Sequence, residues 1–358
     1  MLILCGSGAA GWTAMDVYGW TRAQAEAWAT SIGLPAYRGE QLLRGVYRAD
    51  VRCFAEIPGW PRELGQRLDA AYRLPLAEEV EQHVSSDGTT KSLLRYQDGA
   101  LVECVSIPTP DRHTVCVSTQ VGCPVGCSFC ASGLAGVERN LRAAEIVWQV
   151  LHHHRRRRVT HVVFMGSGEP FLNYDAVIQA IRVLGEPLGL GLGRRRITVS
   201  TSGVPMRIRQ FARDEPQVTL ALSLHAADDA TRSRLVPLNR RWPLAEVLAA
   251  MRDYASQVGR RPTLEYVLLA DANMSRVHAE QLAATARALH AHINLIPYNP
   301  VADLAHVPPE RRAVAAFASM VRRYGGHATV RRPRGCDIAA ACGQLRRQSL
   351  ALFETSQH

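Results

Sequence analysis

The chain has 358 residues, with 42 basic and 32 acidic side chains for a net charge of +10, and 47% of its residues are hydrophobic. This apolar content excludes a disordered chain, and the length predicts two domains or one large α/β barrel. No run approaches the ~20 apolar residues that cross a bilayer, and the N-terminus lacks a secretory signal, so we expect a cytoplasmic protein without membrane contact. The basic surplus favours a polyanionic partner, although every basic residue except Lys91 is arginine, a bias that genome composition also produces.

Residues 21–73 are predicted to form helices. Three helical segments, each bounded by glycine or proline, begin near residues 23, 37 and 61. Turns at Asp87-Gly88 and Asp98-Gly99 then separate short alternating runs, which predicts β-hairpins. We therefore divide the chain into a helical accessory domain (1–75), a linking hairpin region (76–110), a main domain (111–347) and a tail (348–358).

Six apolar, β-type runs with helix-sized connections predict the architecture of the main domain. They cover residues 113–119, 161–166, 197–203, 218–225, 262–269 and 292–299. Such alternation implies parallel strands with right-handed crossovers, and hence an α/β fold in the form of a partial, open (βα)6 TIM-like barrel. In this architecture the C-terminal ends of the strands build the active site.

Three clustered cysteines follow the first of these strands. Cys123, Cys127 and Cys130 form a C-x3-C-x2-C pattern within VGCPVGCSFCASG. Structural zinc normally takes four protein ligands, whereas three thiolates on one loop suit a 4Fe-4S cluster with one open iron. The spacing, with Phe129 before the last cysteine, resembles the signature of radical S-adenosylmethionine (SAM) enzymes.

Glycine and polar residues at other strand ends are candidates for binding SAM. The segment GSGEP, with Gly168 and Glu169, resembles the GGEP motif of radical SAM enzymes, whose backbone and glutamate contact the SAM amino group. Taken singly, each strand-end residue is also explained by capping and loop hydrogen bonds. The remaining candidates are Ser200, Ser223, Leu224, His225 and Asn299.

A longer series of motifs extends the resemblance beyond that superfamily. The strings TVCVSTQVGCPVGCSFC, MGSGEP, ALSLHA, VPLNRR, INLIPYNP and RGCDIAAACGQLR follow one another, and SSDGTTK lies near Ser85. On these motifs, which run from about Tyr37 to Arg347, the chain is identified as a member of the RlmN/Cfr family of radical SAM adenine methyltransferases acting on 23S rRNA. The resemblance implies a 4Fe-4S cluster and two SAM molecules per turnover.

The resemblance also implies roles for three further residues. Cys342, in AACGQL, matches the cysteine that one SAM methylates; a 5′-deoxyadenosyl radical from the second SAM then removes a hydrogen from that methyl group, and its carbon bonds to adenine. Cys116 matches the cysteine that resolves the protein–RNA crosslink by forming a disulfide with Cys342. Glu103, in LVECVSIP, matches the proposed acid/base residue. Reduction of the disulfide implies an external protein such as flavodoxin or ferredoxin.

Alternative functions stay open at this point. Carbon 2 and carbon 8 enzymes of the family, the latter of the Cfr type, share these residues; we favour carbon 2, with 23S rRNA and also tRNA as substrates, and expect a monomer. A radical SAM enzyme acting on a peptide is disfavoured by AACGQL and Cys116. A non-catalytic iron-sulfur RNA-binding protein would have no use for the SAM-binding strand ends.

Several residues depart from the family pattern or lack an assigned function. Cys336 and Ser167 stand where the family usually has other residues. The run HHHRRRR over 152–158 is interpreted as a solvated helix end rather than an RNA-facing patch. In the accessory domain, candidate contacts to RNA phosphates are Arg22, Arg38, Arg44 and Arg48.

Overall fold

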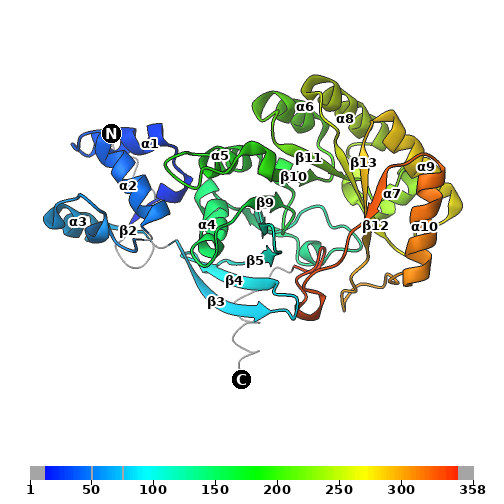
Figure 1. Ribbon diagram of the computed structural model, residues 1–358, viewed down its shortest axis with the longest axis horizontal. Helices are drawn as coiled ribbons and strands as arrows, with labels where there is room; N and C mark the ends of the chain where they lie inside the picture. The colour runs from blue at the N-terminus through cyan, green and yellow to red at the C-terminus, as the bar shows by residue number, and fades with distance from the viewer. Residues whose placement is uncertain (1–12, 50, 75, 346–358) are drawn as a thin grey trace.

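A ten-stranded sheet forms the centre of the molecule. The computed structural model describes residues 13–49, 51–74 and 76–345, and Figure 1 shows a curved sheet with helices on its outside and a smaller helical part beside α4 and α5. The strand order is β14-β13-β12-β11-β10-β9-β6-β5-β4-β3. Strands β6 and β9 to β14 are parallel, and β3 to β6 are antiparallel. Within the described residues the sheet has two edges, β14 and β3, so the predicted open barrel is confirmed.

All six predicted parallel strands are present in the predicted order. They are β6 (His113–Val117), β9 (His161–Phe164), β10 (Ile197–Thr201), β11 (Thr219–Ser223), β12 (Thr263–Leu268) and β13 (His292–Pro297). A seventh, β14 (Ala328–Val330), was not predicted, because three residues are too short to show a periodic pattern. The main helices are α4 (Ala143–His154), α5 (Tyr174–Leu184), α6 (Pro205–Asp214), α7 (Asp229–Leu235), α8 (Leu244–Val258), α9 (Arg276–Ala288) and α10 (Arg311–Arg323).

The predicted hairpins continue the barrel sheet. Strands β3 (Ala77–Val84), β4 (Thr90–Tyr96) and β5 (Leu101–Pro108) form an antiparallel meander whose last strand pairs with β6. Its turns contain Gly88 and Gly99, whose φ values of 82° and 86° favour glycine. In the register, Val105 lies opposite both Lys91 and Cys116. Because side chains alternate along a strand, Lys91, Glu103 and Cys116 lie on one face of the sheet.

Three N-terminal helices form a smaller part of the molecule, which packs against α4 and α5 through the short segment Val17–Gly19. They are α1 (Arg22–Ser31), α2 (Tyr37–Arg48) and α3 (Arg62–Asp69), and short strands β1 (Thr13–Ala14) and β2 (Tyr72–Arg73) pair beside them. The Tyr18 ring meets the Trp148 ring of α4 edge to face at 4.7 Å. The Tyr47 hydroxyl donates to the Tyr18 carbonyl at 2.7 Å. One hydrophobic core therefore runs through both parts.

The four N-terminal arginines already have partners within the protein. Arg22 pairs with Glu26 and Glu40, and Arg44 lies 3.7 Å from Glu40. Arg38 donates to the Gly59 carbonyl, and Arg48 to that of Pro187. These contacts explain the arginines as structural residues, and contacts from them to RNA stay a prediction.

The histidines of the HHHRRRR run are built into the structure. His152 lies 3.0 Å from the Glu79 carboxylate, and Arg156 lies 2.6 Å from it. His153 is buried and its Nε2 lies 3.4 Å from the Cys104 thiol. The interpretation as a solvated helix end is therefore correct only for the exposed residues 156–158, because Arg155 is half-buried over the Trp148 ring. Among the described residues, no helix is both long enough and apolar enough to span a bilayer.

Replacing His153 with leucine is expected to flatten the pH dependence of unfolding. Burial, aided by His152 and Arg156, lowers the pKa of His153 to about 3, whereas a histidine in an unfolded chain titrates near ~6.5. Between these values only the unfolded chain binds the proton, so this histidine lowers stability as pH falls. Its removal should reduce the slope of the unfolding free energy by up to about 1.4 kcal/mol per pH unit. Urea titrations at several pH values between these limits measure the slope, and an unchanged slope contradicts the prediction.

Candidate active site

The three clustered cysteines line one large pocket at the C-terminal ends of the strands. Their loop lies between β7 (Gln120–Gly122) and β8 (Val137–Asn140), and residues at the ends of β9, β10 and β11 line the same pocket. Burial raises the pKa of Cys123 to about 12, and it raises the pKa of Cys127 and Cys130 in the same direction. Thiols in such surroundings become thiolates only when a strong positive charge, such as a metal centre, compensates.

The loop is folded closely enough to hold a compact group. A Cβ on Gly133 would lie 2.8 Å from the Gly126 Cα, so this close approach requires glycine at position 133. Gly126 has a φ of 66°, which also favours glycine. No group of three or more His, Cys, Asp or Glu side chains in the described ranges is arranged to hold a single metal ion. An iron-sulfur cluster needs no such arrangement, because each cysteine binds a different iron. Cys123, Cys127 and Cys130 therefore fit a 4Fe-4S cluster.

Most of the predicted SAM-binding residues line the same pocket. They are Gly168, Glu169, Ser200, Ser223, His225 and Asn299. Gly168 has a φ of 104°, and a Cβ there would lie 2.7 Å from Thr119 Oγ1, so only glycine fits. Leu224 differs: its side chain is fully buried in the hydrophobic core, and its carbonyl accepts from Arg232. Contact of Leu224 with SAM stays a prediction for its main chain.

Hydrogen bonds fix the polar groups of this pocket. The buried Glu169 carboxylate accepts from Thr201 Oγ1 at 2.6 Å, and from the main-chain N–H groups of Ser202 and Phe171. The hydroxyls of Ser200 and Ser223 are 2.9 Å apart.

His225 is a neutral acceptor in the pocket wall. Burial, with Arg232 nearby, lowers the pKa of His225 to about 3, and its Nδ1 accepts from the Val267 N–H at 3.1 Å. A neutral imidazole on the wall leaves this side of the pocket without added positive charge.

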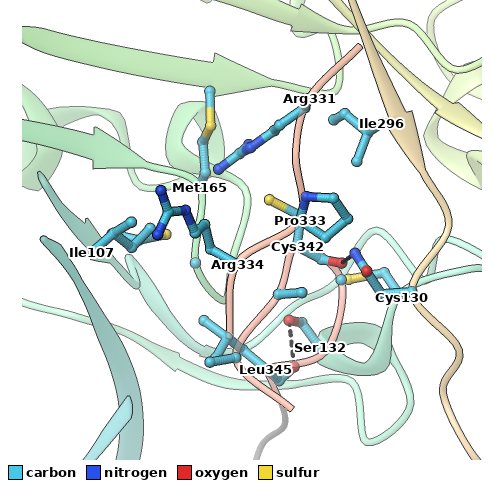
Figure 2. A pocket seen from close by; sticks show the side chains of 16 residues that line it. Ile107, Cys130, Ser132, Met165, Ile296, Arg331, Pro333, Arg334, Cys342 and Leu345 are labelled. Carbon is cyan, nitrogen blue, oxygen red and sulfur yellow. Dashed lines mark hydrogen bonds between the residues drawn. The ribbon is translucent and has the colours of Figure 1, made fainter. Parts of the chain in front are cut away.

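Cys342 lies where this pocket meets a second one. The second pocket is lined by Cys116, Ile107, Met165 and Arg334 among others, and Cys130 and Cys342 line both pockets. Figure 2 shows Arg331 and Arg334 reaching into it from the same C-terminal segment as Cys342. The structure thus brings the predicted carrier cysteine next to both the cysteine loop and the predicted resolving cysteine.

The thiol of Cys116 is buried and lies near the Arg331 guanidinium. Burial and the neighbouring Cys342 raise the pKa of Cys116 to about 12. The Arg331 guanidinium acts in the opposite direction. The pKa of Arg331 is itself raised, first by Cys342 and then by Glu265 and Cys116. Arg331 therefore lies near both cysteines and can stabilise a thiolate at Cys116.

Hydrogen bonds on both sides hold the segment that carries Cys342. The Gly343 carbonyl accepts from the Ala131 N–H, and the Leu345 carbonyl accepts from Ser132 Oγ, both at 2.8 Å. At the other end Ser85 Oγ donates to Asp337 at 2.6 Å. Figure 1 shows this segment running back from β14 to the β3–β4 turn.

Asn299 holds the same segment in its middle. Its amide donates to the Cys342 carbonyl at 3.4 Å and accepts from the Cys336 thiol at 3.3 Å. Cys336 is exposed, and all the cysteines of the described ranges are free thiols.

Glu103 lies beneath the C-terminal segment and outside the walls of both pockets. It is only 2% exposed, and its Oε1 lies 3.0 Å from Lys91 Nζ. It shares a face of the sheet with Cys116, two residues along β5 from the Val105 that pairs with Cys116. A base at Glu103 therefore requires the adenine to close the remaining distance.

Comparison with known proteins identifies the family. Residues 117–281 match the Radical SAM superfamily. A protein from Thermosynechococcus vestitus named as a probable dual-specificity RNA methyltransferase RlmN is 45% identical over 338 residues, covering 94% of this chain and 99% of the relative. The chain belongs to the RlmN family. A second relative of the same name, from Gloeobacter violaceus, is 47% identical to this RlmN-family chain and covers 90% of it and 93% of the relative.

A solved structure supports the same assignment. The crystal structure of a radical SAM methyltransferase from Sphaerobacter thermophilus matches this RlmN-family chain with a TM-score of 0.89 and 45% identity, over 92% of this chain and 99% of the other. Members of the superfamily use a 4Fe-4S cluster and SAM, and these are the cofactors of the present chain.

Sequence reasoning missed several residues of this RlmN-family site. Arg331 is one of many arginines in the sequence and Glu265 lies in an apolar run, so neither was predicted as a site residue, yet both line the pocket of the clustered cysteines. Ser167, a departure from the family pattern, donates to Ser132 Oγ at 3.1 Å inside the protein. Glu265 could have been recognised as a candidate site residue, because it is an acidic residue inside an otherwise apolar strand.

Proposed function

We propose that this RlmN-family protein is a radical SAM RNA methyltransferase that methylates carbon 2 of an adenine in 23S rRNA and in tRNA. The observation that carries the proposal is the position of Cys342 on the boundary between the cysteine-loop pocket and the pocket of Cys116. The relatives are named as dual-specificity RNA methyltransferases, which supports RNA as the substrate and two classes of it.

The cofactors have matching residues in the larger pocket. Cys123, Cys127 and Cys130 would hold the cluster, and Glu169 with the strand-end serines would hold SAM. When bound, these cofactors supply the 5′-deoxyadenosyl radical that the superfamily uses. The protein's part is to keep water and oxidants from this chemistry and to keep Cys342 within reach.

Cys342 acts as the carbon carrier in this proposal. Its sulfur first accepts a methyl group from SAM as the thiol proton leaves, beside the Arg331 guanidinium that lines the same pockets. After one hydrogen atom is removed from that methyl group, the carbon bonds to the adenine, and protein and RNA are joined covalently.

Cys116 and Glu103 then release the product. Bonding of the carbon radical leaves one unpaired electron on the adenine, which the bound cluster would accept as Glu103 takes the proton from the modified carbon. The Cys116 sulfur then attacks the Cys342 sulfur. The step forms an S–S bond and breaks the S–C bond; the electron pair stays on the carbon, and a proton completes the new methyl group. Because the pKa of Cys116 is about 12, its thiol must lose a proton as the bond forms.

The resulting Cys116–Cys342 disulfide must be reduced before the next turnover. We propose that an external reductant protein of the flavodoxin or ferredoxin type supplies the electrons, and that the protein works as a monomer. RNA would reach the pocket beside Arg331 and Arg334 by flipping out one adenine, because the reacting carbon is inaccessible in a stacked base.

Mass spectrometry of modified adenines is the direct test. After anaerobic reaction of the reconstituted protein with SAM, a reductant and either 23S rRNA or tRNA, we expect 2-methyladenosine in both RNAs. 8-Methyladenosine would contradict the choice of carbon 2. Methyl transfer to a peptide, with neither RNA modified, would contradict the proposed substrate class.

A further inference from the structure

The single lysine of the chain lies beside the acid/base candidate. Lys91 Nζ is 3.0 Å from Glu103 Oε1, and the two side chains are only 12% and 2% exposed. The same ammonium donates to the Ala339 carbonyl at 3.4 Å. Lys91, on β4, therefore contacts both Glu103 of β5 and the segment that carries Cys342.

Composition makes this lysine informative. Every other basic residue among the 42 is arginine. Position 91 is therefore the one basic position at which the chain has lysine in place of arginine. A lysine ammonium is a compact point charge with three donors on one nitrogen, whereas a guanidinium is a planar fork. A carboxylate oxygen and a carbonyl oxygen from two chain segments meet at one nitrogen here, which fits an ammonium.

The carbonyl that Lys91 holds belongs to a residue in an unfavourable conformation. Ala339 has a φ of 49°, in the left-handed region that residues with a Cβ rarely adopt. It lies three residues before Cys342. A contact that stabilises this conformation therefore helps to determine where the Cys342 backbone lies.

We propose that Lys91 is a positioning residue for methyl transfer. Its ammonium binds both the Glu103 carboxylate and the carbonyl of Ala339 in the Cys342 segment. The proton acceptor and the carbon carrier then keep a constant spacing while the adenine bonds between them. When Glu103 takes the adenine proton its charge is neutralised, and the ion pair with Lys91 is lost at the step that precedes release. This inference rests on the proposed function, because it assigns Lys91 to the release half of that reaction.

Three variants separate positioning from simple tethering. Lys91→Met removes the ammonium, and Lys91→Arg keeps the charge but changes its geometry. Asp337→Asn is the matched control: Asp337 anchors the same segment through Ser85 Oγ but does not contact Glu103. Cys116→Ala serves as the reference for a trapped RNA adduct.

The first readout measures two steps of the reaction separately: methylation of Cys342, and release of methylated RNA from the protein–RNA adduct. For Lys91→Met we expect methylation of Cys342 at close to the wild-type rate, persistence of the protein–RNA adduct and at least about a tenfold slower release of methylated RNA, within the range that general bases contribute. Lys91→Arg should also release RNA more slowly than the wild type. Asp337→Asn should slow Cys342 methylation and release together.

The second readout needs neither cofactor nor RNA. Because Lys91 is the single lysine, the chain has only two amines that acetic anhydride can acetylate: the Lys91 side chain and the terminal amine. With limiting reagent, peptide mass spectrometry gives the ratio of acetylation at these two amines. We expect Glu103→Gln to increase acetylation of Lys91, because a neutral amide no longer pairs with the ammonium. The control Cys104→Ala, next to Glu103 but on the opposite face of β5, should leave the ratio unchanged.

Each contrary result has a defined meaning. Release of methylated RNA at the wild-type rate by Lys91→Met or Lys91→Arg overturns the inference. Equal slowing of Cys342 methylation and of RNA release by Lys91→Met also overturns it. Either pattern leaves no special role for the ammonium beside Glu103. An acetylation ratio unaffected by Glu103→Gln also overturns it. If even Cys116→Ala yields no adduct while the acetylation result holds, the proposed function fails, and the assignment of Lys91 to product release fails with it.

Discussion

Replacement of Cys342 with alanine is expected to abolish methylated adenine, with a loss of about 10⁴-fold or more, as is usual when a covalent catalytic residue is removed. Cys342 lines both pockets, and no other thiol in the described ranges occupies that boundary except Cys130, which is assigned to the cluster. Without its sulfur the carbon has no carrier. Mass spectrometry after one turnover measures the loss of the methyl group on the protein and the loss of methylated adenine in the RNA.

The matched control for this substitution lies in the same segment. Cys336 is exposed and six residues from Cys342, and its thiol contacts the same Asn299 amide. Cys336→Ser keeps a hydrogen-bond donor there and should retain product formation and methylated Cys342. Substantial methylated adenine from Cys342→Ala would show that the carbon takes another route.

Replacement of Cys116 with alanine is expected to trap the protein–RNA adduct. Cys116 is the buried thiol of the second pocket, close enough to Cys342 to influence its own pKa, and the proposed release needs its sulfur to attack. Without it the S–C bond persists, and about one RNA should be joined to each active protein. Denaturing gel electrophoresis of the anaerobically reconstituted protein with labelled RNA measures the adduct.

Cys104→Ala is the control for that experiment. Cys104 is also fully buried in the sheet, but on the opposite face of β5 from Val105, the partner of Cys116. It should release methylated RNA without accumulating adduct. Free methylated RNA formed by Cys116→Ala at the wild-type rate would exclude the resolving role.

The features that the sequence predicted well are those with a local pattern. Six parallel strands have apolar runs of adequate length, and the spacing of Cys123, Cys127 and Cys130 can be recognised within eight residues. The two turns of the meander contain Asp-Gly pairs, and their glycines have the left-handed backbone that this pairing favours. Each of these signals depends only on residues near one another in the chain.

The features that the sequence did not predict depend on contacts between distant segments. Arg331 could not be distinguished from the other arginines, because its contact with Cys116 joins residues more than two hundred positions apart. The same holds for the pairing of Lys91 with Glu103, which requires the register of β4 and β5. Leu224 was chosen from its strand-end position, but strand alternation alone did not show that its side chain faces the core.

The hydrogen bonds around Cys342 limit how the methyl carbon can travel. The carbonyls of Cys342 and Gly343 both accept hydrogen bonds from neighbouring segments. The backbone at Cys342 is therefore held in place during the reaction. In the proposed reaction the carbon moves only as far as rotation about the cysteine side chain allows. Both SAM molecules must then deliver to nearly the same point in turn, and the first must leave before the second can react.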